Sequence, residues 1–273
     1  TVFSYICFKS YFAGDFEFSE ILLRDYIQQA KDKFPSLRFS VDDFQDDLIL
    51  SVCMLIKDGL NYRFAHRSFQ EYFAAWYTCK LTDDTQARLL TTWMGESGDA
   101  RQDEYLPMLF NLQPEKVNKI LFCPGIIKIK ALYESMGFSC ELLKRLFKGI
   151  RLKRKSERGG ALHYYTFLII QDEYLCNIMI MTGRLNHYVY KDQQKLQVDD
   201  FVQRVKNAAK AMGKRYKIEW SIDELLQLVT EEELLKSVEW FDIRYRFCLD
   251  ILEKNTTHNI SRKKKVSTIL DEL

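Results

Sequence analysis

The sequence predicts a mainly α-helical protein with one small β-hairpin near its N-terminus. Of the 273 residues, 47% are hydrophobic, which is enough apolar side chain for a large buried core. Only 11 residues are glycine and 4 are proline, whereas all-β chains need many more of both for their turns. From residue 19 onward, apolar side chains recur at the spacing of three and four that one face of a helix requires.

The first predicted elements form a helix, a helix, a hairpin and a helix. Ser19 precedes an apolar helical face that Pro35 ends, and Ser40 opens a second helix. Two short β-prone runs, 54–56 and 62–64, then flank a link that contains glycine, which is typical of a β-hairpin. A third helix begins at about residue 66. This order is that of a winged-helix module, which we expect over residues 1–81.

Short helices with short links follow, as in a helical bundle or a solenoid. Thr82 caps a helix that runs through Trp93, and residues 105–112 form another. Pro114 and Pro124 each fit the first turn of a further helix, where the missing N–H costs nothing. We expect a helical linker domain over residues 82–158 and a helical, sensor-like C-terminal domain over residues 159–273.

Two segments of the second half have weaker signals. Residues 138–155 are amphipathic and become basic toward their end, so we expect a helix that a pair of glycines then breaks. Residues 161–190 fit either a helix throughout or a buried strand over 163–170 followed by a helix, and we favour the helix.

The last third of the chain has clearer helix signals. Residues 199–212 form an amphipathic helix that ends at a glycine, and two capping boxes open the next two helices. The apolar seam from residue 234 to 252 is expected to pack inside the domain and not in a coiled coil. The two capping boxes are Ser221 with Glu224 and Thr230 with Glu233.

Composition argues against a membrane protein and a secreted one. The longest nearly continuous apolar run, residues 164–170, is far shorter than the roughly 18 residues that span a bilayer. The N-terminus has no methionine and no basic region before an apolar core, so no signal peptide is visible. We therefore expect a fragment of a longer, cytoplasmic protein.

Cysteine and histidine patterns indicate neither a metal site nor a catalytic site. The seven cysteines include no CxxC pair and have no histidine at ligand spacing, so we expect reduced thiols, mostly buried. Neither HExxH nor GxSxG occurs, and no catalytic residue is assigned.

Charge is distributed unevenly, with a net charge of −4 over residues 1–135 and +6 over residues 136–273. Within residues 144–158, eight cations stand against a single acidic residue, Glu157. One interpretation is a face that binds nucleic acid or phosphate. The other, which we favour, is a solvated helix end with a linker. The eight cations are Lys144, Arg145, Lys148, Arg151, Lys153, Arg154, Lys155 and Arg158, of which the last six are the candidate anion-binding residues.

The most informative motif lies where the hairpin meets the third helix. Residues 62–75 read YRFAHRSFQEYFAA. This run resembles the signature F-x-H-x-S/T-F-Q-E-Y/F-F/L-A-A near the end of the winged-helix part of NACHT-type STAND NTPases, which include NOD-like receptors and bacterial anti-phage proteins. The resemblance covers about residues 1–125. The matching positions are Phe64, His66, Ser68, Phe69, Gln70, Glu71, Tyr72, Phe73, Ala74 and Ala75.

The resemblance implies a role for His66 in sensing the nucleotide state. In that family an N-terminal P-loop domain holds the nucleotide, and the winged-helix histidine closes over the phosphates of ADP at rest. The alternative for His66 is structural, namely that it caps and packs. The supporting motif residues are Phe64, Ser68, Phe69, Gln70, Glu71, Tyr72 and Phe73. We expect a buried face formed by Phe69, Tyr72, Phe73 and Trp76.

The same resemblance implies partners and cofactors for the parent protein and not for this chain. No GxxxxGK[ST] loop occurs in the sequence, so we expect this chain to bind no cofactor alone and to be no enzyme. ADP or ATP with Mg²⁺ is expected in the parent, which would hydrolyse ATP. The implied partners are the parent's own NTPase domain, a trigger of phage origin that the C-terminal region senses, and further copies on activation. A bacterial origin is inferred from the short C-terminal region without leucine-rich repeats.

Two rival functions stay open at this stage. In the first, the winged helix and the basic segment 144–158 bind DNA or RNA directly, which neutralising Lys153, Arg154 and Lys155 would abolish. In the second, the chain is a structural adaptor without a ligand.

Overall fold

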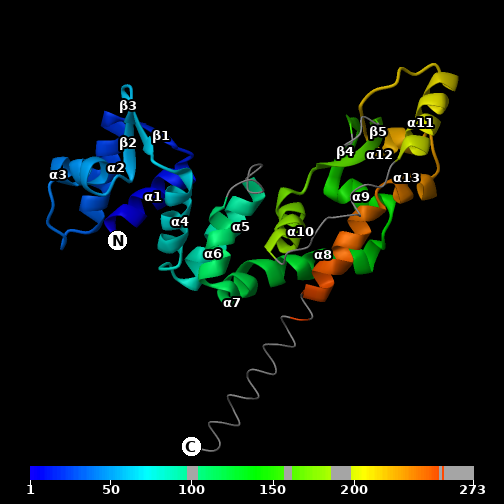
Figure 1. Ribbon diagram of the computed structural model, residues 1–273. Coiled ribbons are helices and arrows are strands. Elements are labelled where there is room, and N and C mark those ends of the chain that lie inside the picture. Colours follow the sequence, from blue (N-terminus) through cyan, green and yellow to red (C-terminus); the bar gives the residue numbers. More distant parts are fainter. Residues whose placement is uncertain (97–103, 157–161, 186–197, 252–253, 255–273) are drawn as a thin grey trace, which may run out of the picture. The chain divides into compact units, whose positions relative to one another are not determined.

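The computed structural model describes residues 1–96, 104–156, 162–185, 198–251 and 254 (Figure 1). The chain is mainly helical, with two small antiparallel sheets. It divides into two compact units. The N-terminal unit comprises residues 1–90 and 99–120, and the C-terminal unit comprises residues 91–98 and 121–273. The boundary between residues 90 and 91 falls inside one helix, α5 (Asp83–Glu96).

The N-terminal unit combines helices with a three-stranded sheet in the order β1-β3-β2. Strand β3 is antiparallel to both neighbours, and the β2–β3 hairpin turns at Gly59, whose φ of 63° favours glycine. The elements are α1 (Val2–Ala13), β1 (Glu17–Ser19), α2 (Glu20–Lys33), α3 (Val41–Asp46), the π-helix η1 (Asp47–Ser51), β2 (Leu55–Asp58), β3 (Asn61–Phe64), α4 (Arg67–Thr78), α6 (Tyr105–Leu112) and α7 (Pro114–Val117).

The start signals that the sequence predicts are confirmed in this unit. The Ser19 side chain accepts the amide of Leu22, and the Ser40 side chain accepts the amides of the first turn of α3. Pro114 lies at the first position of α7. The predicted hairpin is confirmed as β2 and β3, and the third helix as α4.

Helix α1 was not identified from the sequence, and it supplies part of the core of the N-terminal unit. Ile6 and Cys7 of α1 are buried together with Phe18, Leu23 and Ile27. Aromatic side chains on α1 also pack against α4 and α6. Phe3 contacts Phe73 edge-on, at a centroid distance of 4.9 Å, and Tyr11 stacks on Tyr105 at 4.7 Å.

The C-terminal unit combines helices with a three-stranded sheet, whose strand order is β5-β4-β6. All strand pairs are antiparallel, and β4 and β5 form a long hairpin (Figure 1). The elements are the end of the π-helix η2 (Asn118–Phe122), which begins in the N-terminal unit, and α8 (Cys123–Met136), α9 (Cys140–Leu146), β4 (Phe147–Ser156), β5 (Leu162–Ile170), α10 (Glu173–Leu185), α11 (Asp199–Ala211), β6 (Glu219–Trp220), α12 (Ile222–Leu226) and α13 (Glu231–Ser237). Residues 239–251 form a further helical segment.

Two sequence predictions in this unit were wrong. Residues 138–155 are not one helix, because α9 ends at Leu146 and β4 follows. Along β4, Ile150 and Leu152 are buried and Arg151 and Lys153 are exposed, a period of two that a strand requires. Residues 162–170 are likewise a strand, and within the described part of the segment 161–190 the helix comprises residues 173–185. Residues 186–190 lie outside the described part.

The helix signals of the last third are confirmed. Both capping boxes form, with reciprocal bonds between Ser221 and Glu224 and between Thr230 and Glu233. The described seam positions Leu234, Val238, Phe241, Tyr245 and Cys248 are buried in the unit. The β4–β5 hairpin crosses the expected boundary between residues 158 and 159.

At Gly149, the backbone of β6 leaves no room for a side chain on β4. The register shifts between Phe147 and Gly149, and a Cβ added at Gly149 would lie 2.3 Å from the carbonyl oxygen of Trp220. Gly149→Ala is therefore expected to separate these strands and to lower the free energy of unfolding by about 1–3 kcal/mol. The measurement is urea denaturation followed by circular dichroism.

Gly95→Ala is the matched control for this substitution. Gly95 lies in α5, and a Cβ added there meets no atom within 4 Å. Because alanine favours a helix over glycine, we expect the stability to be unchanged or to rise by up to about 1 kcal/mol. Equal losses in the two variants would contradict the close approach at Gly149.

Candidate functional site

His66 occupies the corner between β3 and α4, as the N-cap residue of that helix. Its Nδ1 lies 3.2 Å from the amide nitrogen of Ser68 and 2.6 Å from the hydroxyl oxygen of the same residue. Because a backbone amide can only donate, Nδ1 is the acceptor, and the neutral ring carries its proton on Nε2. The ring is exposed. The corner therefore presents an N–H donor at the positive end of α4.

Phe64 anchors this corner to the core of the N-terminal unit. Its side chain is 5% exposed, and its ring packs against Phe18 and Phe3 at centroid distances of 5.6 and 6.2 Å. Just beyond it, the amide of Ala65 donates to the carbonyl of Met54, 2.9 Å away. The backbone that precedes His66 is thus fixed from both sides.

Gln70 joins α4 to the end of α1. Its side-chain nitrogen donates to the hydroxyl of Ser10 at 2.8 Å and to the carbonyl of Asp15 at 2.9 Å. Gln70 is fully buried. This glutamine of the motif therefore has a structural role, because it satisfies a backbone carbonyl that has no helical partner.

Glu71 and Arg67 form a second fixed pair of the motif. Glu71 is buried, and the Nε of Arg67 lies 3.1 Å from its carboxylate. The Arg67 guanidinium also stacks on the ring of Phe16, at 4.3 Å from the centroid. The charge of Arg67 is therefore balanced within the helix and held beside His66.

The predicted burial of the α4 aromatic residues was wrong for three of the four. Phe69, Tyr72 and Trp76 are 36%, 39% and 43% exposed, and only Phe73 packs against the core. The buried face of α4 consists instead of Gln70, Glu71, Ala74, Ala75 and Thr78. Small side chains on that face let α4 lie close to α1. We call Phe69, Tyr72 and Trp76 the α4 aromatic face.

The α4 aromatic face begins next to His66. The rings of His66 and Phe69 lie 6.4 Å apart at their centroids, at an angle of 70°. Trp76, two turns further along, lies under the ammonium of Lys80 at 5.8 Å. The helix thus presents a donor nitrogen at its start and apolar rings along its exposed side.

The candidate anion-binding residues of the second half lie on β4 and not on a helix. Lys148, Arg151, Lys153 and Arg154 are exposed on this strand, whereas Arg158 lies outside the described residues. The backbone of Lys155 pairs with His163, and its side chain is not described. Strand geometry therefore spreads these charges over two faces of the sheet.

Ion pairs neutralise part of the positive charge of the segment 144–158. Arg151 pairs with Glu219 on β6 at 2.6 Å, and Lys144 on α9 pairs with Asp223. Arg145 lies 3.9 Å from Asp172. The segment 144–158 by itself is thus less available to an anion than its sequence indicates.

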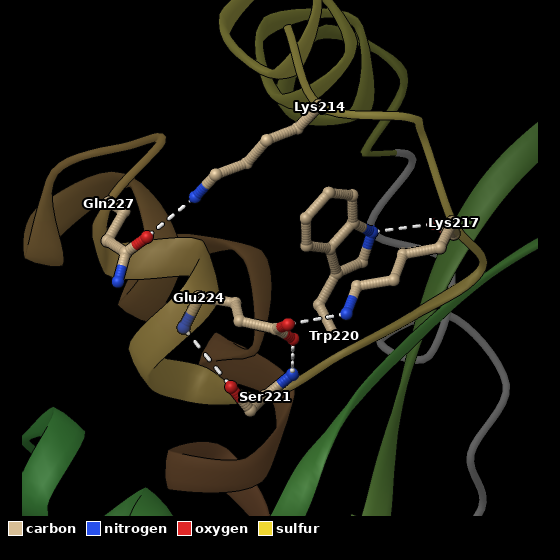
Figure 2. A network of polar contacts seen from close by, with 6 residues as sticks. All are labelled: Lys214, Lys217, Trp220, Ser221, Glu224 and Gln227. Atoms are coloured by element: carbon tan, nitrogen blue, oxygen red, sulfur yellow. Dashed lines mark hydrogen bonds and ion pairs between the residues drawn. The ribbon is translucent and has the colours of Figure 1, made fainter. Parts of the chain in front are cut away.

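Sequence analysis missed a second group of cations, on α11 and the loop to β6. Figure 2 shows two of them, Lys214 and Lys217, reaching toward α12. The Nζ of Lys214 donates to Gln227 at 2.6 Å, and the Nζ of Lys217 donates to Glu224 at 2.5 Å. The bond from Lys217, followed by the one from the backbone amide of Ser221, lowers the pKa of Glu224. The run of lysines at 206, 210, 214 and 217 was the available signal.

Neither unit offers a described metal centre. Among the described residues, no three His, Cys, Asp or Glu side chains are arranged to hold a metal ion. Within the same residues, no helix combines the length and the apolar character that crossing a membrane requires.

Comparison with known proteins gave one match. The model of the family described as "Short NACHT-associated C-Terminal domain, family 7" (SNaCT7) matches residues 110–273, which is more than half of the chain. No curated protein and no solved structure matches the sequence.

Proposed function

The chain belongs to family 7 of the short NACHT-associated C-terminal domains, and from this premise we propose that it is the regulatory C-terminal part of a NACHT NTPase that acts as a switch in bacterial anti-phage defence. A domain of this family implies a NACHT domain earlier in the parent protein, which is this chain's first partner. ATP binding with Mg²⁺ and ATP hydrolysis belong to that domain. We propose no catalytic step for this chain, because its sequence contains no GxxxxGK[ST] loop.

The N-terminal unit acts as a winged helix in this proposal. The order α1, β1, α2, α3, β2, β3 and the sheet order β1-β3-β2 support that assignment. The β2–β3 hairpin is the wing, and the motif that follows it fixes the start of α4. The wing and His66 therefore belong to one rigid corner.

The observation that carries the proposal is the exposed Nε2–H of His66 at the N-terminus of α4. A neutral imidazole with this tautomer donates to a phosphate without first taking up a proton. The helix N-terminus adds a partial positive charge next to it. The residues present thus fit the diphosphate of ADP, which the NACHT domain of the parent holds. The α4 aromatic face is the surface that meets that domain.

The switch has two states in this account. At rest, His66 and the α4 aromatic face hold the NACHT domain in its ADP form. A trigger that binds the C-terminal unit better in the open state shifts the equilibrium toward release, nucleotide exchange and oligomerisation. The trigger acts only through this difference in affinity.

The test uses the full-length parent with the substitution His66→Asn. Asparagine is a good N-cap residue, so the start of α4 is kept while the Nε2–H is lost. A hydrogen bond to a charged group contributes about 1.5–3 kcal/mol, so ADP should bind roughly 10- to 100-fold more weakly. The measurement is the nucleotide retained after purification, with a dissociation constant from calorimetry.

Lys33→Ala on α2 serves as the control, because this exposed lysine has no ion-pair partner among the described residues. It should retain ADP like the parent. The isolated chain of residues 1–273 should bind no ADP, because the NACHT domain supplies most of the contacts. Unchanged ADP affinity in the His66→Asn parent would contradict the proposal and favour the adaptor without a ligand.

A further inference from the structure

Pairing between β4 and β6 brings two basic segments of the C-terminal unit together. The amide of Leu152 donates to the carbonyl of Ile218 at 2.8 Å, and Arg151 is the register partner of Glu219. Continuing this antiparallel register places residues 153 and 154 beside residues 217 and 216. The basic end of β4 therefore lies next to the loop between α11 and β6.

The ring of Tyr164 on β5 joins these segments to α11. The Nζ of Lys206 lies 4.5 Å from its centroid and donates to its hydroxyl at 2.9 Å. The guanidinium of Arg154 lies 5.9 Å from the same centroid. Lys206 is also 5.1 Å from the ring of Tyr216 in the loop. Cations from a strand and from a helix thus converge on two tyrosine rings.

We call the resulting patch the basic surface. Its cations are Arg154, Lys206, Lys210, Lys214, Arg215 and Lys217. Lys217 has an acidic partner in Glu224, and Lys214 has the neutral Gln227 (Figure 2). In the part of the chain that the structure describes, Arg154, Lys210 and Arg215 are exposed and make no ion pair. Their charge is therefore available to a partner.

We propose that the basic surface binds the phosphate backbone of a single-stranded nucleic acid. Four of the six cations are lysines, which are depleted in protein–protein interfaces but are common in phosphate contacts. The rings of Tyr164 and Tyr216 are half-buried among these cations. A charged surface with aromatic rings is the arrangement that binds single strands. This inference does not depend on His66 or on the nucleotide switch.

The test measures binding of a fluorescently labelled 20-nucleotide oligouridine to the chain of residues 1–273 by anisotropy, between 50 and 300 mM KCl. The variant Arg154→Gln/Lys210→Gln/Arg215→Gln removes three exposed cations of the basic surface that make no ion pair among the described residues. For single strands, each lost phosphate contact lowers the slope of log K against log salt by about 0.7. We expect the slope to fall by about 2 and the affinity at 100 mM salt to fall roughly 10- to 100-fold.

The matched control removes the same charge from the N-terminal unit. Lys9→Gln/Lys33→Gln/Arg38→Gln replaces three exposed cations that likewise have no ion pair among the described residues. Its affinity and salt slope should stay close to those of the unmodified chain. Thermal melts establish that each variant is folded. Should the triple variant not fold, Lys210→Gln/Arg215→Gln, with an expected slope change of about 1.4, replaces it.

Three outcomes would overturn the proposal. The first is no binding of oligouridine by the unmodified chain at 50 mM salt. The second is an equal loss of affinity in the two triple variants, which would indicate a net-charge effect. The third is tighter binding of polyglutamate or of a 20-base-pair duplex than of the single strand, which would assign the surface to an acidic protein or to double-stranded nucleic acid.

Discussion

Phe64→Ala is expected to lower the free energy of unfolding of the N-terminal unit by about 3–5 kcal/mol, the usual cost of emptying a buried phenylalanine site. The ring is almost fully buried, and it contacts Phe18 and Phe3. The β2–β3 hairpin offers only a few other apolar residues to this core, so the cavity has little with which to collapse. Urea denaturation followed by intrinsic fluorescence measures the change.

Phe69→Ala is the matched control, since it makes the same chemical change five residues further along the same motif. The Phe69 side chain is 36% exposed and lies on the α4 aromatic face. Little apolar area returns to water on truncation, so we expect a loss of less than about 1 kcal/mol. In the parent protein this variant should instead weaken docking of the NACHT domain. Similar stability losses for Phe64→Ala and Phe69→Ala would contradict the division of the motif into an anchor and an exposed face.

Sequence alone predicts the corner around His66 because its signals are local. A glycine in the turn and β-prone runs on either side act over a few residues, and each reappears in the structure. The burial of α4 depends on α1, which lies far away in the sequence. Helix α1 is apolar on all sides, so it shows no amphipathic period. Because α1 was not predicted, the aromatic residues of α4 were expected to form the buried face of that helix.

The strands β4 and β5 were missed for a different reason. The bulge at Gly149 interrupts the alternation of β4, which leaves an alternating run too short to distinguish a strand from one face of a helix. The partner strand β6 is only two residues long. It is also distant in the sequence, since Glu219 lies 68 positions after its partner Arg151. Such a long-range pairing leaves no local signal. The sequence therefore indicated the cations of β4 but not that β4 lies beside the cations of α11.

The apolar seam of residues 234–248 shows how a predicted core position acquires its energetic weight from a partner elsewhere in the chain. Tyr245 of this seam stacks face to face on Tyr133 of α8, with a centroid distance of 3.4 Å and an interplanar angle of 7°. Phe241 lies on the same side, 6.3 Å from Tyr133. Spacing indicated that Tyr245 is buried, but only the fold shows which ring it meets.

Substitutions of Tyr133 are expected to have opposite effects according to what they remove. Tyr133→Ala empties the stack and should lower the free energy of unfolding by about 3–5 kcal/mol. The hydroxyl of Tyr133 is buried and has no hydrogen-bond partner among the described residues. Tyr133→Phe removes that unsatisfied group and keeps the ring, so stability should be unchanged or rise by about 1 kcal/mol. Urea denaturation at pH 7 distinguishes the two variants, and a loss in Tyr133→Phe as large as in Tyr133→Ala would indicate that the hydroxyl is bonded.

The pH dependence of stability provides a second measurement on Tyr133. Burial, followed by the nearby charge of Asp242, raises the pKa of this phenol above its ordinary value of 10.0. Because the folded state favours the neutral phenol, its contribution to stability is complete below pH 10 and is lost as the pH rises above that value. The Tyr133→Phe chain should therefore lose less stability than the unmodified chain between pH 9 and about 11. Burial also raises the pKa of Tyr245, so part of the alkaline loss should persist in the variant, and identical pH profiles would contradict the burial of the Tyr133 hydroxyl.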